Sequence, residues 1–134
     1  MSAALALRAA IHQRLVGDPD LGALLNARIY DEVPGNARLP YLVLSGIESR
    51  DAGTGTERGE EHRLVLDLWS QAGGLGEALV AASQVVTLLD DAPLGLSGHA
   101  LANLRWVATD ARRTADGRYR FASLRFRAVT EPTA

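Results

Sequence analysis

The chain has 134 residues, a length at which one domain with one hydrophobic core is usual. Hydrophobic residues make up 47% and charged residues 22% of the chain, and charges interrupt every apolar stretch, so neither general disorder nor a membrane partner is expected. The net charge of −2 argues against a general nucleic-acid binder, and the absence of cysteine excludes disulfides, thiolate nucleophiles and cysteine-based zinc sites.

All 14 basic residues are arginine, and they are distributed unevenly along the chain. Residues 101–130 contain seven arginines and two acids, whereas residues 1–100 contain seven arginines and thirteen acids. Guanidinium groups bind carboxylates through two parallel hydrogen bonds and stack on aromatic rings. This composition favours contacts between molecules.

Two helices are predicted at the start of the chain. Ser2 can cap a helix that runs to about Leu15, and Gly17 supplies a stop. Asp18 and Pro19 indicate the start of a second, short helix. The apolar residues of the first helix recur at i, i+4 and i+8: Leu7, Ile11 and Leu15.

Extended structure is predicted next. Residues 28–33 indicate a short strand closed by Pro34 and Gly35, and Pro40 precedes a β-branched and aromatic run at 41–48. Residues 51–59 contain three glycines without periodicity, which predicts a mobile loop.

A half-buried strand is predicted from Glu60 to Ser70, because apolar and polar residues alternate. One face carries His62, Leu64, Leu66 and Leu68, and the other carries Arg63, Val65, Asp67 and Trp69. Gly73 and Gly74 end this strand. The following helix, which ends at Asp90 and Asp91, has an apolar stripe of Leu75, Leu79, Ala82, Val85, Val86 and Leu89.

Two final strands, at about 100–113 and 118–130, are joined by Asp116-Gly117, a strong hairpin signal. A two-residue turn would place Val107 opposite Phe126, Thr109 opposite Leu124 and Trp106 opposite Arg127. The core face of the hairpin is then Val107, Ala111, Ala122, Leu124 and Phe126. The opposite face is Trp106, Asp110, Arg112, Tyr119, Phe121, Arg125 and Arg127.

The predicted element order is therefore α(α)βββαββ, in a single domain that spans residues 1–134. We expect an α+β fold, with an antiparallel-rich mixed sheet of about five strands and two main helices packed on one face.

No pattern of catalytic residues is recognisable. The three histidines, His12, His62 and His99, lack the spacing of metal ligands, so we expect no metal site and interpret each as structural. The glycine-rich segment 53–59 lacks the lysine of a phosphate-binding loop and precedes a strand rather than a helix. We therefore expect no cofactor and no enzymatic activity.

The aromatic and arginine-rich sheet face is the remaining candidate site, since Trp, Tyr and Arg are enriched at binding hot spots. Its predicted interface residues are Trp69, Trp106, Tyr119, Phe121, Arg125 and Arg127. The alternative is a solvated face whose tryptophan packs under a loop or helix. A second candidate is a loop that reaches a neighbouring subunit or ring, formed by Thr54, Gly55, Thr56, Glu57 and Arg58.

A family resemblance rests on three landmarks in order: residues 27–34 (ARIYDEVP), 40–44 (PYLVL) and 62–70 (HRLVLDLWS). With the helix ending at Asp90 and the last hairpin, they resemble the tail completion, or tail terminator, family of long-tailed phages and gene transfer agents. The resemblance covers nearly the whole chain and depends on order and spacing, without catalytic residues to transfer.

This resemblance implies a homohexameric ring that caps the tail tube and joins it to the head-side connector or stopper, with DNA passing through the lumen unread. It also implies a place in a virion or phage-like particle and assembly in the bacterial cytoplasm. Another neck or tail ring component, such as a head-tail connector or tube subunit, is the nearest alternative. A binding module for a small molecule or single protein partner, or an enzyme with an unrecognised site, ranks lower.

Overall fold

A computed structural model describes residues 1–71, 73 and 75–133 of the chain. Its elements follow the predicted order and are α1 (Ala3–Val16), α2 (Pro19–Leu25), β1 (Ile29–Tyr30), β2 (Tyr41–Asp51), β3 (Glu60–Ser70), α3 (Gly76–Leu89), β4 (His99–Arg113) and β5 (Arg120–Pro132). Of the predicted break at Gly73 and Gly74, the second residue lies outside the described part of the chain.

Side-chain caps start the first two helices where the sequence predicts them. The Ser2 hydroxyl accepts a hydrogen bond from the Leu5 amide at 3.1 Å, and the Asp18 carboxylate accepts one from the Leu21 amide at 2.9 Å. Such caps satisfy amides that have no partner within the helix, each contributing about 1 kcal/mol. Pro19 then occupies the first turn of α2, where its missing amide hydrogen has no cost.

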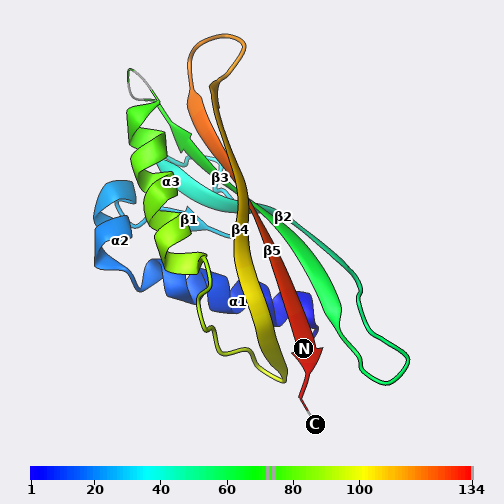
Figure 1. Ribbon diagram of the computed structural model, residues 1–134. Helices are drawn as coiled ribbons and strands as arrows, with labels where there is room; N and C mark the ends of the chain where they lie inside the picture. The colour runs from blue at the N-terminus through cyan, green and yellow to red at the C-terminus, as the bar shows by residue number, and fades with distance from the viewer. Residues whose placement is uncertain (72, 74, 134) are drawn as a thin grey trace.

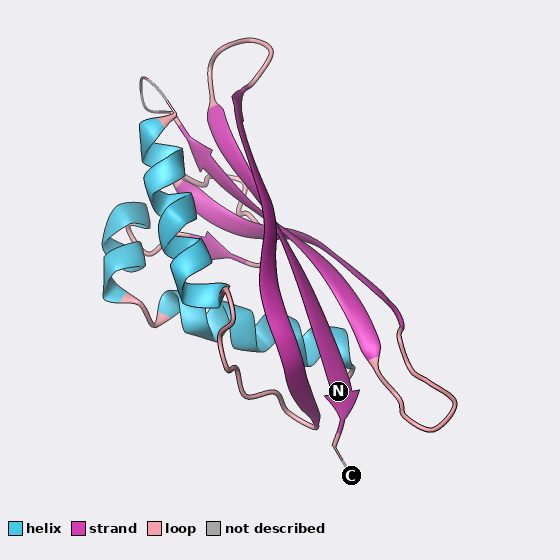
Figure 2. Ribbon diagram, in the orientation of Figure 1, coloured by secondary structure: helices cyan, strands magenta, loops and turns pink. Residues whose placement is uncertain are grey.

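The strands form one mixed sheet in the order β1-β2-β3-β5-β4, in which only the β1-β2 pair is parallel. All three helices lie on one side of this sheet, and the other face is left without a helix (Figures 1 and 2). The predicted α+β fold, with its helices on one side, is therefore confirmed.

The hydrophobic core lies between the helices and the covered sheet face. The alternation predicted for β3 is confirmed, because its leucines are buried while the side chains between them lie on the uncovered face. Burying one such leucine stabilises the fold by about 1.5–3 kcal/mol. The main contributors are Leu7, Ile11, Leu15, Leu64, Leu66, Leu68, Ala122, Leu124 and Phe126.

The stripe predicted for α3 is wrong at Leu79, which is 44% exposed. The buried side is rotated toward the small residues Ala78, Ala81 and Ala82, followed by Val85, Leu88 and Leu89. Alanine side chains let the helix backbone approach the packed sheet closely, so the alanine side of α3 faces inward and Leu79 faces out.

Two strand lengths differ from the prediction. The strand expected at 28–33 contains only Ile29 and Tyr30, since the chain turns after Tyr30 and has no further partner on β2. By contrast, β2 continues past residue 48 to Asp51, because β3 pairs with it residue by residue as far as Glu60. Pairing across strands, which local sequence does not encode, determines both lengths.

The predicted pairing of the last hairpin holds near its turn and fails farther along. Thr109 lies opposite Leu124 as expected, but Val107 is inserted as a β-bulge without a partner on β5. Trp106 consequently lies opposite Phe126 instead of Arg127. One extra residue reverses the faces of the residues beyond it, here as far as a second register shift between Leu101 and Asn103. The prediction of a buried Val107 is therefore also wrong, and this residue is 57% exposed.

The hairpin turn is longer than the predicted two residues. The last backbone hydrogen bond between the two sides of the hairpin runs from the Thr114 amide to the Tyr119 carbonyl at 3.0 Å, so four residues make the loop. The Asp116 carboxylate accepts hydrogen bonds from the Thr114 hydroxyl and the Arg118 amide, and Gly117 takes a φ of 73°, which suits glycine.

Candidate interaction surface

The sheet face without helices is the candidate functional site. It is formed by β2, β3, β5 and β4, whose alternate side chains point away from the core. Two groups of side chains are brought together on it, one aromatic and one arginine-rich, at different positions along the strands.

Aromatic side chains form a row across the sheet at the end nearest the β4-β5 turn. Trp69 lies directly opposite Phe121, and their rings are stacked with centroids 5.2 Å apart. Tyr41 lies opposite Trp69 on the other side, and its ring is 5.8 Å from that of Tyr30. Burial, followed by the nearby Asp67 carboxylate, raises the pKa of Tyr41 above its usual value. All four rings are half-buried, so they both stabilise the sheet and present surface.

Arginines occupy the middle of the same face. Arg63 on β3 lies opposite Arg127 on β5, which in turn lies opposite Arg105 on β4. Arg125 projects from the same face of β5, two residues before Arg127. We call Arg63, Arg105, Arg125 and Arg127 the arginine row. The pairing of the strands therefore places these positively charged side chains next to one another.

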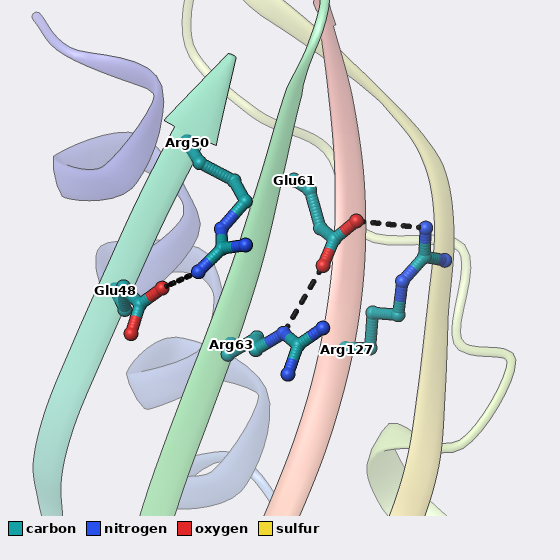
Figure 3. A network of polar contacts seen from close by, with 5 residues as sticks. All are labelled: Glu48, Arg50, Glu61, Arg63 and Arg127. Carbon is teal, nitrogen blue, oxygen red and sulfur yellow. Dashed lines mark hydrogen bonds and ion pairs between the residues drawn. The ribbon is translucent and has the colours of Figure 1, made fainter. Parts of the chain in front are cut away.

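Carboxylates partly neutralise the arginine row. Glu61 accepts hydrogen bonds from both Arg63 and Arg127 at 3.1 Å, as Figure 3 shows, and Arg105 lies 3.6 Å from Asp90. The hydrogen bonds from Arg63 and then Arg127 hold the pKa of Glu61 below its ordinary value. Arg125 forms no ion pair within the described part of the chain.

A hollow of about 630 Å³ lies on this face beside the arginine row. Val65 and Gly46 contribute apolar lining, and the exposed Val107 of the bulge stands at its edge. Glu48, which is bound to Arg50 in the network of Figure 3, lines it from β2. Apolar and charged side chains thus line the same hollow, a combination that also occurs at protein–protein interfaces.

The structure separates one predicted interface residue from the others. Trp69, Phe121, Arg125 and Arg127 lie on the uncovered face, and the half-buried Tyr119 lies near Tyr41 beside the hairpin turn. Trp106 was expected there, but the bulge at Val107 moves it to the helix-covered side. Its amide donates a hydrogen bond to the Asp90 carboxylate at 2.9 Å, and its side chain is 45% exposed.

Several charged residues of this face were not predicted as site residues, among them Glu61, Arg63 and Arg105. Arg63 is assigned to the correct face by the alternation of β3, but its proximity to Arg127 depends on the β3-β5 pairing. Arg105 reaches this face only because of the bulge. The one sequence signal for the group is the excess of arginine in residues 101–130.

The predicted reaching loop lies at the opposite end of the sheet from the aromatic row. Residues 54–58 are exposed and connect β2 to β3 (Figure 1). The Thr54 hydroxyl accepts a hydrogen bond from the Glu57 amide at 3.0 Å, and the Thr54 amide donates one to the Glu57 carbonyl at 2.7 Å. The loop thus has a local turn of its own and projects from the sheet end.

His62 is buried in the covered face as a hydrogen-bonded structural residue. Its ring nitrogens lie 2.6 Å from the Ser49 hydroxyl and 2.8 Å from the Thr130 hydroxyl. Burial, more than any neighbouring charge, lowers the pKa of His62. Among the described residues no cluster of three or more potential metal ligands occurs, and none of the described helices is long and apolar enough to cross a membrane.

These observations define a small α+β protein whose candidate site is an exposed interaction surface. Residues 9–131 match the family of tail completion protein gp17, so the chain belongs to this family. It is also similar to a chain in a solved structure described as the virion of a native gene transfer agent particle. The two are 34% identical with a TM-score of 0.91, and the match covers 97% of this chain and 98% of that one. No curated protein matches the chain.

The family match confirms the resemblance inferred from the three sequence landmarks. Membership of a tail completion family supports a structural role in a phage-type tail rather than catalysis. Similarity to a chain of a gene transfer agent virion supports a location in a virion particle.

Proposed function

We propose that residues 1–134 act as one tail terminator domain. Copies of the chain form a homohexameric ring that caps the tail tube and joins it to the head-side connector or stopper. DNA passes through the lumen of this ring without being read in sequence. The subunits are made in the bacterial cytoplasm and join the particle there.

The similarity to a chain of a gene transfer agent virion is the observation that supports this proposal most strongly. It extends over nearly the full length of both chains, at an identity of 34%. The uncovered sheet face adds physical support, because it combines stacked aromatic rings, arginines and an apolar hollow on a rigid scaffold. Surfaces of this composition bind other proteins.

Imaging of intact particles tests the proposal directly. The chain, carrying a density label fused to its C-terminus, should form a ring of six labels between the tube and the head connector. Deleting its gene should leave uncapped tails and heads without tails. Labels elsewhere in the neck or tail would assign the chain to another ring, and absence of the chain from particles would refute a structural role.

The double variant Arg125→Glu, Arg127→Glu tests whether the uncovered face is used. It should fold, since both side chains are exposed, but should yield uncapped or headless tails. The matched variant Arg38→Glu, Arg113→Glu changes the charge equally at exposed sites outside the arginine row and should assemble normally. Normal assembly of both variants would show that this face is not an interface.

A further inference from the structure

The arginine row has more positive charge than the subunit itself neutralises. Arg63, Arg127 and Arg105 are directly opposed across three strands, and like charges in such positions destabilise the pairing. Glu61 is shared by two of these arginines, and Asp90 lies at 3.6 Å from the third. Arg125 beside them has no ion pair among the described residues, so the four guanidinium groups can bind carboxylates from outside the subunit.

The apolar part of the hollow indicates what kind of anion fits. Val107, which is 57% exposed at the bulge, lines the hollow together with the half-buried Val65. Glu48 and Glu61 belong to the same surface as the arginines (Figure 3). A phosphate backbone would be repelled by these carboxylates and would gain nothing from the valines. An acidic segment of protein that also carries apolar side chains matches both features.

Such a segment is present at the opposite edge of the same sheet. The residues that follow β1, which we call the acidic turn, are Asp31, Glu32, Val33 and Pro34. Both acids are exposed, and although Asp31 is bound by Arg8 at 3.0 Å, Glu32 forms no ion pair within the described residues. Pro34 is also exposed, so the acidic turn offers carboxylates next to an apolar ring.

We infer that the arginine row of one copy binds the acidic turn of a second copy. The inference rests on the proposed ring and specifies the contact between its subunits. β1 and β4 are the two outer strands of the sheet, so each copy would use one side of the sheet toward each neighbour. A contact between two different surfaces of this kind is heterologous, and it closes into a ring when the rotation permits.

A pair of introduced cysteines tests this contact without changing any charge. The natural chain has no cysteine, and the variant combines Pro34→Cys in the acidic turn with Val107→Cys in the hollow. The two positions cannot form a disulfide within one copy, because β1 and β4 are four strand spacings apart, roughly 19 Å, whereas a disulfide needs Cα atoms within about 7 Å.

Oxidation of purified particles should convert the double-cysteine chain into a ladder of oligomers up to the complete ring. The yield should exceed that of either single-cysteine variant by at least about tenfold. Arg38→Cys with Arg113→Cys, at exposed positions outside both surfaces, is the matched pair and should give no ladder. Absence of the Pro34–Val107 ladder, in particles that contain the chain, overturns this contact and leaves the terminator function standing. Absence of the chain from particles overturns the function itself.

Charge exchange in the cysteine-bearing background gives a second, independent test. Arg125→Glu and Glu32→Arg should each lower the cross-linking yield at least about tenfold, because each places like charges across the contact. When the two variants are produced together, alternation of the two chains restores opposite charges at every contact, so the yield should recover. Failure to recover overturns the inference. So does a result in which Arg125→Glu weakens binding of double-stranded DNA but leaves cross-linking unchanged.

Discussion

The stacked pair of Trp69 and Phe121 predicts a measurable coupling energy. Replacing a fully buried phenylalanine by alanine costs about 3–5 kcal/mol, and Phe121 is half-buried, so Phe121→Ala should lower the free energy of unfolding by about 2 kcal/mol. Stacking at a centroid distance of 5.2 Å adds about 0.5–1.5 kcal/mol that exists only when both rings are present. With an m-value of about 2 kcal/mol per M, the urea midpoint should fall by about 1 M.

Urea unfolding of the wild type, Trp69→Ala, Phe121→Ala and the double variant, followed by circular dichroism, measures the coupling. The cost of the double variant should be smaller than the sum of the single costs by about 0.5–1.5 kcal/mol. A cycle that combines Phe121→Ala with Val107→Ala is the control, since Val107 lies near Phe126, about five residues farther along β5, and the two costs should add. A coupling indistinguishable from zero for Trp69 and Phe121 would refute the stacked geometry.

Three further predictions concern His62, the loop at residues 54–58 and small ligands. Burial lowers the pKa of His62, so protons bind more tightly to the unfolded chain than to the folded one. The free energy of unfolding should therefore fall as the pH drops through about 6.5, and it should fall less steeply in the variant His62→Gln. Identical pH profiles of the two proteins would contradict this. Residues 54–58 should exchange amide hydrogens faster in the free subunit than in particles, and equal protection would exclude ordering by a neighbour. Calorimetry with zinc, ATP and GTP should show no binding, and a dissociation constant below about 10 μM would contradict a purely structural role.

Local sequence predicted the elements of this fold well, because caps, turns and alternation act over a few residues. Ser2 and Asp18 start helices through their own side chains, and β3 alternates in the sequence as it does in the sheet. The orientation of α3 was less predictable, since Leu79 and the neighbouring alanines all suit a helix, and close packing against the sheet decides which side is buried.

The candidate site was predicted only in part, because strand pairing assembles it. Trp69 and Phe121 were placed on the correct face, but the β3-β5 pairing that stacks them joins distant parts of the sequence. Nothing in the sequence around Val107 indicates that this residue has no partner on β5. That single bulge moved Trp106 away from the predicted face and brought Arg105 onto it.

The position of β5 has a consequence for the order of synthesis and assembly. This last strand of the chain inserts between β3 and β4, pairing Glu60 with Thr130, so β3 keeps an open edge while the nascent chain grows. At about 5–20 residues per second, the ribosome delivers β5 roughly 3–10 seconds after β3. Two residues of the arginine row, Arg125 and Arg127, arrive only with it. A chain interrupted before β5 therefore lacks the strand that joins β3 to β4 and two residues of the arginine row.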